Sequence, residues 1–137
     1  ETEQYLIFNK EKGYTTPADV KGGVVGAQIS SIQEDLAKEL GAEHGFKVEN
    51  RNLIPELIQE LKTGRFDAAV IENIVSENYL ANNDDLAAFP IEVEEPDYKA
   101  IVFQEGSALK AEFDKVIEEL TADGTIDELK KKWFVVE

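Results

Sequence analysis

The chain contains no cysteine and no methionine, and its one histidine is His44. Without cysteine it has no disulfide framework, no thiolate nucleophile and no sulfur-ligated metal site. A single histidine also disfavours a histidine-based metal site and a Ser-His-Asp triad. Neither a G-x-G-x-x-G turn nor a Walker loop is present to hold a nucleotide. We therefore expect no metal ion and no cofactor.

Long apolar runs and an excess of basic residues are also missing. No apolar run approaches the roughly 20 residues that a membrane-spanning helix needs, and no signal-peptide pattern opens the chain. The 29 acidic residues outnumber the 14 basic ones and give a formal charge of −15. Nucleic acids and anionic membrane surfaces attract basic surfaces, so neither is an expected partner. With no initiator methionine, the chain is expected to be a processed product or an excised piece.

Residues 24–40 organise the chain. Small and β-branched residues bounded by glycines predict a short buried strand at its start. A helical pattern of apolar residues follows. Ser31 and Glu34 have the spacing of a capping box, in which Ser31 accepts a backbone N–H and Glu34 reaches back to the amide of the cap itself. Gly41 is predicted to end the helix. The unit is therefore a strand, a tight turn and a helix N-terminus.

The rest of the chain alternates between strand and helix patterns. Its 137 residues, 42% apolar, are enough for one ordinary domain with a core. We predict further strands at 5–8, 46–49, 66–71, 86–93 and 98–103, and helices at 17–19, 52–62, 74–80, 108–120 and 125–134. Pro90 favours an edge position for its strand, and residues 98–103 are expected to pair with 5–8. This order predicts an α/β fold, a mostly parallel sheet with helices on both faces.

Two ends of predicted strands carry polar residues, at 28–33 and at Glu72. Ligands bind beyond the carboxyl ends of strands in open α/β sheets. Amides near Ser30, Ser31 and Ile32 would suit a carboxylate, and Glu72 would suit an ammonium. A free α-amino acid carries both groups. The alternatives are that the two serines only begin a helix and that Glu72 is an exposed turn residue.

Three segments together resemble a known family. They are VGAQISSIQEDL at 25–36, TGRFDAAVIE at 63–72 and ADGTIDELKKKWF at 122–134. They are similar to V-G-V-Q-x-G-[ST]-[ST]-x-E-D-L, S-G-R-x-D-A-x-x-x-D and x-D-G-T-x-x-x-I-x-x-K-W-F of the amino-acid-binding proteins of ABC importers. That family is solute-binding family 3, of the type II periplasmic-binding-protein fold.

The resemblance implies a non-catalytic lobe with a flavodoxin-like, three-layer arrangement. Complete members have two lobes, dock on a membrane permease and lie outside the cytoplasm, where a lipoprotein anchor is expected. This chain resembles the second lobe, at 1–104, plus a C-terminal helical segment, at 105–137, that would normally pack on the first. A homodimer that exchanges these helices is a further hypothesis.

The resemblance also assigns candidate site residues. Gln28 and Ser31 match ligand contacts, the backbone at Ser30 and Ile32 matches the carboxylate donors, and Glu72 matches the acid that holds the α-ammonium. Gln33 completes the predicted turn. Ser30 stands where the family has glycine, Ile32 where threonine, serine or glycine is usual, and Glu72 where aspartate is usual. These departures leave the choice of amino acid open.

Two other functions are compatible with the resemblance to this fold. A dehydratase acting on small carboxylic acids would need a general acid or base in the cleft, and Glu72 is the one candidate in the predicted site. A ligand-sensing receptor module would use the same cleft without catalysis. Flanking sequence would separate the receptor from the transport protein, and turnover of a small acid would reveal the enzyme.

Overall fold

The computed structural model describes residues 2–93 and 98–134. The chain divides into two compact units, Glu1–Asp97 and Tyr98–Glu137. The first is an α/β domain, and the second consists mainly of two helices. The predicted division at residues 104 and 105 stays a prediction.

A five-stranded sheet forms the middle of the first unit, in the order β3-β2-β4-β1-β5. Strand β2 pairs in parallel with β3 and β4, whereas β1 is antiparallel to both β4 and β5. Within this sheet β1 is therefore the one reversed strand, and the predicted mostly parallel arrangement is confirmed. The strands are β1 (Gln4–Asn9), β2 (Val24–Gln28), β3 (Lys47–Arg51), β4 (Ala68–Glu72) and β5 (Leu86–Ile91).

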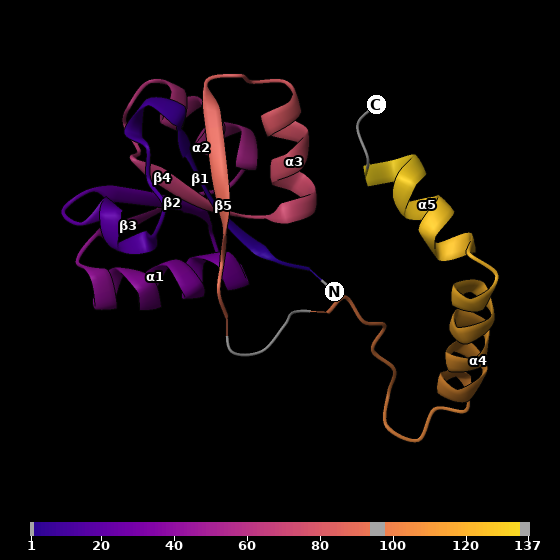
Figure 1. The fold of residues 1–137 in the computed structure, drawn as a ribbon. Coiled ribbons are helices and arrows are strands. Elements are labelled where there is room, and N and C mark those ends of the chain that lie inside the picture. The colour runs from indigo at the N-terminus through magenta and orange to yellow at the C-terminus, as the bar shows by residue number, and fades with distance from the viewer. Residues whose placement is uncertain (1, 94–97, 135–137) are drawn as a thin grey trace. The chain divides into compact units, whose positions relative to one another are not determined.

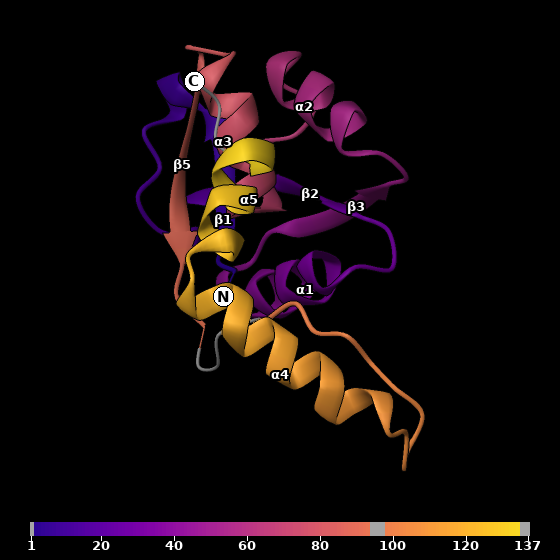
Figure 2. The ribbon, with the colours of Figure 1, turned by 90° about the vertical axis from the view of Figure 1, so that its right-hand side faces the viewer.

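Helices cover both faces of the sheet, as predicted. Helix α1 (Ile32–His44) lies on one face, and α2 (Ile54–Lys62) and α3 (Asn73–Ala81) lie on the other (Figures 1 and 2). Two short 3-10 helices, η1 (Lys10–Lys12) and η2 (Pro17–Val20), connect β1 to β2. The result is a three-layer α/β/α unit.

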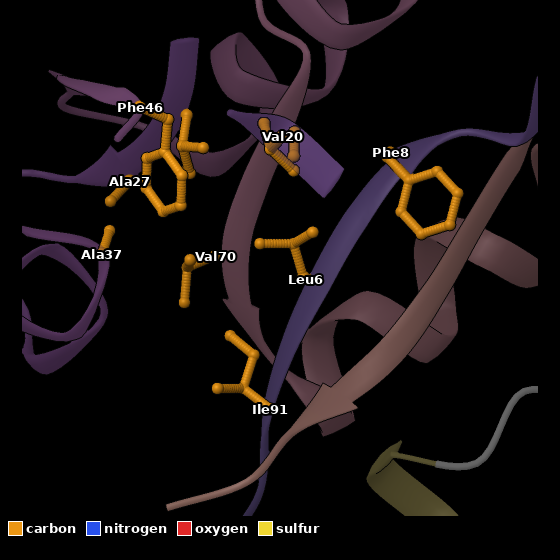
Figure 3. Close-up of a cluster of buried hydrophobic side chains, with 10 residues drawn as sticks. Leu6, Phe8, Val20, Ala27, Ala37, Phe46, Val70 and Ile91 are labelled. Carbon is orange, nitrogen blue, oxygen red and sulfur yellow. The ribbon is translucent and has the colours of Figure 1, made fainter. Parts of the chain in front are cut away.

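The alternation of strand side chains divides the core into two clusters. Leu6 and Val70 face α1, where they meet Ala37 (Figure 3). Their neighbours in the sequence, Ile7 and Ile71, point to the opposite face and pack with α2 and α3. Because successive strand residues point to opposite faces, each central strand contributes to both clusters. The sheet is thereby fixed between its helices, and so are the strand ends that carry the polar residues.

The predicted end of α1 at Gly41 is wrong, because the helix continues to His44. It ends at Gly45, which has a left-handed conformation with φ 82° and donates its N–H to the Gly41 carbonyl at 2.9 Å. Gly41 is explained by packing instead. A Cβ atom there would lie 2.9 Å from the Phe46 carbonyl oxygen, so the helix interior needs a glycine where the chain returns past it.

The predicted strand at residues 98–103 is also wrong, because no strand is assigned there. Both sides of β1 are already paired, with β4 on one side and β5 on the other. The strand predicted at 86–93 is β5, which lies at an edge of the sheet as Pro90 indicated. Since β5 pairs along the whole of β1, it takes the place that had been predicted for residues 98–103.

The second unit contains α4 (Leu109–Ala122) and α5 (Thr125–Phe134). Thr125 and Glu128 have the spacing of a second capping box, which predicts Thr125 as the cap. This prediction is wrong, because Thr125 is the first residue of α5 and Glu128 donates its amide to the Gly124 carbonyl. Phe113 and Trp133 are 42% and 68% exposed. The helix-exchanged homodimer stays a hypothesis. Among the described residues, no helix combines the length and the apolar character needed to cross a membrane.

Candidate functional site

The turn between β2 and α1 begins at Ile29, whose amide donates to the Arg51 carbonyl at 2.9 Å. The next residue is Ser30, with φ 57°. Among the described residues, it is the only one other than glycine that has a positive φ. The left-handed conformation costs an L-residue about 1 kcal/mol or more, which explains why glycine is favoured at such a position. The departure at Ser30 therefore places strain in the turn.

The predicted helix cap at Ser31 is confirmed, but the capping box differs in one bond. Ser31 Oγ accepts from the Glu34 amide at 3.2 Å and donates to the Gln28 carbonyl at 2.6 Å. The Glu34 carboxylate accepts from the amide of Ser30, at 2.7 Å, rather than from that of Ser31. The left-handed turn brings the Ser30 amide to the carboxylate, so this amide is already engaged within the protein.

Glu34 is a buried carboxylate, 6% exposed, with three donors around it. Lys38 forms an ion pair with it at 2.8 Å, and Asn50 Nδ2 donates to it at 2.8 Å. Lys38, Asn50 and the Ser30 amide, in that order, lower the pKa of Glu34 to about 2. Since Glu34 holds the Ser30 amide, the helix donors that an anion can reach are the next ones, at 31–33.

This arrangement predicts how Glu34 affects stability with pH. A carboxyl whose pKa is lowered on folding stabilises the native state fully above its unfolded pKa, near 4.5, and loses that contribution as pH falls toward 2. We expect Glu34→Gln to be less stable than the wild type at pH 6, with the difference shrinking between about pH 4.5 and 2. Urea unfolding of both proteins across this range measures it. A difference that stays constant with pH would contradict the assignment.

The second half of the site is the junction between β4 and α3. Glu72 ends β4 and stands at the N-cap of α3 with extended backbone angles, φ −60° and ψ 141°. The following residue, Asn73, donates its amide to the Glu3 carbonyl at 2.9 Å and accepts from the Glu3 amide at 3.3 Å. These bonds fix the junction against the start of β1. The half-buried Glu72 carboxylate thus comes from a rigid part of the sheet.

A small pocket of about 60 Å³ brings three of the six predicted residues together. Gln28, Gln33 and Glu72 contribute its polar groups. Its apolar walls come from α2, β4 and α3: Ile54, Leu57, Val70, Ile71 and Val75. By this measure roughly 10–15 Å³ already holds one water molecule, so the pocket has room for an ammonium-sized group.

The other three predicted residues, in the turn and at the first position of α1, are not in the pocket lining. Ser30 and Ser31 make the turn and cap described above, and the Ile32 side chain is 51% exposed. Gln28 Nε2 donates to the Asn52 carbonyl at 3.0 Å, which ties the end of β2 to the beginning of α2. The amides at 31–33 and the Glu72 carboxylate therefore offer donors and a negative charge at the same edge of the sheet.

Gln4 belongs to this region but was not predicted from the sequence. Its side chain is 2% exposed, and its Oε1 accepts from Gln33 Nε2 at 2.8 Å. Gln4 lies opposite Glu72 in the pairing of β1 with β4. Alternation could have found it, because Gln4 precedes Leu6 and Phe8 at a spacing of two and so belongs to the buried row of β1.

Comparisons with known proteins place the chain in a family. The model of the bacterial extracellular solute-binding proteins, family 3, matches residues 14–136. The arginine-binding extracellular protein ArtP of Bacillus subtilis (strain 168) is 46% identical over 138 residues, which cover 96% of this chain and 52% of ArtP. The L-cystine-binding protein TcyA of the same strain is 31% identical, covering 85% of this chain and 43% of TcyA.

Solved structures share the fold. The amino acid ABC transporter substrate-binding protein AbpA from Streptococcus pneumoniae Canada MDR_19A, bound to L-arginine, has a TM-score of 0.85 and 31% identity, covering 97% of this chain and 57% of AbpA. An ancestral arginine-binding protein bound to arginine has a TM-score of 0.80 and 33% identity, covering 98% of this chain and 61% of the ancestral protein. The chain spans about half the length of ArtP and TcyA. It belongs to the bacterial extracellular solute-binding proteins of family 3.

Proposed function

We propose that this chain is one lobe of an amino-acid-binding protein that serves an ABC importer. The α-carboxylate of the ligand binds the amides at 31–33, at the N-terminus of α1, where orphan N–H groups and the helix dipole favour an anion. The α-ammonium binds Glu72. The pocket that gathers Gln28, Gln33 and Glu72 beside this helix is the observation that supports the proposal most directly.

Arginine is the amino acid that we propose as the ligand. Its support is the 46% identity to ArtP, named as arginine-binding, and the likeness to AbpA bound to L-arginine. The net charge of −15 favours a cationic ligand over an anionic one. The protein binds and releases its ligand without chemistry, outside the cytoplasm, and hands it to a membrane permease when the rest of the molecule is present.

A single lobe supplies half of a two-lobed cleft, so its affinity is expected to be weak, on the order of millimolar. A two-dimensional ¹H–¹⁵N NMR titration with L-arginine at constant ionic strength tests the proposal. We expect saturable shifts of the amides of Ser31, Ile32, Gln33 and Asn73.

Agmatine is the matched control ligand, because it keeps the guanidinium of arginine and lacks the α-carboxylate. Its ammonium can still reach Glu72 and Gln33, but the amides of Ser31 and Ile32, which are proposed to bind the carboxylate, should stay unmoved. Equal shifts of these two amides with arginine and agmatine would mean that they do not report carboxylate binding. No shifts with arginine would overturn the proposed site in this chain.

A further inference from the structure

Gln4 is a buried amide in a row of β1 that otherwise faces the core. It shares this row with Leu6 and Phe8, which are 0% and 3% exposed, and is itself 2% exposed. Burying an amide is unfavourable unless hydrogen bonds compensate for the lost water. An apolar residue at this position would avoid that cost, so the amide calls for an explanation beyond packing.

The bond that Gln4 accepts comes from a side chain of the site. Most side-chain hydrogen bonds in proteins go to the backbone or to water. Here Gln33 Nε2, 29 positions away in the sequence, donates to Gln4 Oε1 at 2.8 Å. Gln33 lines the same pocket as Glu72, and Glu72 is the residue paired with Gln4 across β1 and β4. The first turn of α1, β1 and β4 therefore meet at this amide pair.

The bond also decides which end of the Gln33 amide is turned toward Gln4. An amide has a nitrogen that donates and an oxygen that accepts. With the nitrogen held by Gln4, the carbonyl oxygen of Gln33 points the other way. Because Gln33 lines the pocket, an oxygen turned into it would add a hydrogen-bond acceptor to the carboxylate of Glu72. Two acceptors suit a group with several N–H donors, such as an ammonium.

We propose that Gln4 is a positioning residue of the ligand site. Through its hydrogen bond it holds the Gln33 side chain with the carbonyl oxygen available to the ligand's ammonium, next to Glu72. Gln4 itself does not touch the ligand. This inference rests on the function proposed above.

Methionine substitutions test it, because methionine has nearly the shape of glutamine and no amide. In the 137-residue chain, Gln4→Met should weaken arginine binding about fivefold, the effect of losing one neutral hydrogen bond. Gln33→Met should weaken it at least as much, and the double variant should bind no more weakly than Gln33→Met alone. Gln28→Met is the matched control, because Gln28 donates to the Asn52 carbonyl. In the double variant Gln4→Met, Gln28→Met, the loss of arginine affinity should be the product of the two single losses.

A measurement without ligand separates positioning from folding. In the free wild type the side-chain NH₂ signals of Gln33 should differ from those of an exposed amide, and Gln4→Met should move them toward exposed values. If the wild type binds arginine and Gln4→Met binds equally well, the positioning role is overturned and the proposed function stands. The positioning role would also be overturned if Gln4→Met weakened arginine binding by the same factor in the Gln33→Met background as in the wild type. If the wild type does not bind arginine, the proposed function fails and this inference fails with it.

Discussion

Replacing Glu72 by glutamine is expected to remove detectable arginine binding. Glutamine keeps the length of the side chain and one acceptor oxygen, but it loses the negative charge that we propose to bind the ammonium. Hydrogen bonds between charged partners contribute about 1.5–3 kcal/mol each, which corresponds to a loss of roughly 10- to 100-fold in affinity. The apolar walls of the pocket, Leu57 and Val70 among them, strengthen the effect by keeping the dielectric low. From a starting dissociation constant near a millimolar, such a loss leaves no saturable shift.

Two further variants make this prediction specific. Glu77→Gln removes the same charge from an exposed position on α3, the helix that follows Glu72, and should leave arginine affinity within about twofold of the wild type. Glu72→Asp restores the aspartate that is usual in the family and keeps the charge, so it should still bind. If Glu72→Gln bound arginine as the wild type does, the ammonium would have to bind elsewhere. If Glu77→Gln were equally damaging, the attraction would come from the general acidity of the chain.

Features that depend on local spacing could be predicted from the sequence. Ser31 caps its helix because the hydroxyl and the amide that it accepts are three residues apart, a distance set by helix geometry alone. The short helix after Thr16 also follows from local spacing, since Pro17 fits its first position and the Asp19 carboxylate accepts from the Thr16 amide at 2.9 Å. Short apolar and β-branched runs, with alternation at 46–49, identified each strand of the sheet, and period-3.6 patterns identified each of the long helices.

Features that depend on distant contacts could not be predicted. Gly41 resembles a helix end, and only the return of Phe46 past it shows why a helix interior needs a glycine there. Residues 98–103 have a good strand pattern, but β1 already pairs on both sides, which no local pattern reveals. In the candidate site, Gln33 was predicted, whereas its orientation by Gln4 depends on a contact across 29 residues. Likewise, Glu34 accepts from the Ser30 amide and not from the predicted Ser31 amide, because the left-handed turn at Ser30 brings that amide to the carboxylate.

Replacing Gly26 by valine is expected to destabilise the α/β unit by about 3 kcal/mol or more. Glycine inside a strand normally weakens it, but here a Cβ atom would lie 2.6 Å from ring carbons of Phe66 and 2.9 Å from Leu57 Cδ2. Both side chains are buried, at 2% and 0% exposure, and cannot move aside freely. Overpacking of this kind typically costs 1–3 kcal/mol, and valine adds two methyl groups beyond the Cβ.

Urea unfolding monitored by circular dichroism measures the loss, and a second variant identifies its cause. Leucine at position 66 is smaller and more flexible than phenylalanine, so Gly26→Val should cost about 1 kcal/mol less in a Phe66→Leu background than in the wild type. Equal costs in the two backgrounds would show that the destabilisation arises elsewhere. Because Gln28 follows two residues later on the same strand, an overpacked β2 would also displace the turn that begins the candidate site. The tight contact at Gly26 therefore links the packing of the sheet to the geometry of the proposed ligand donors.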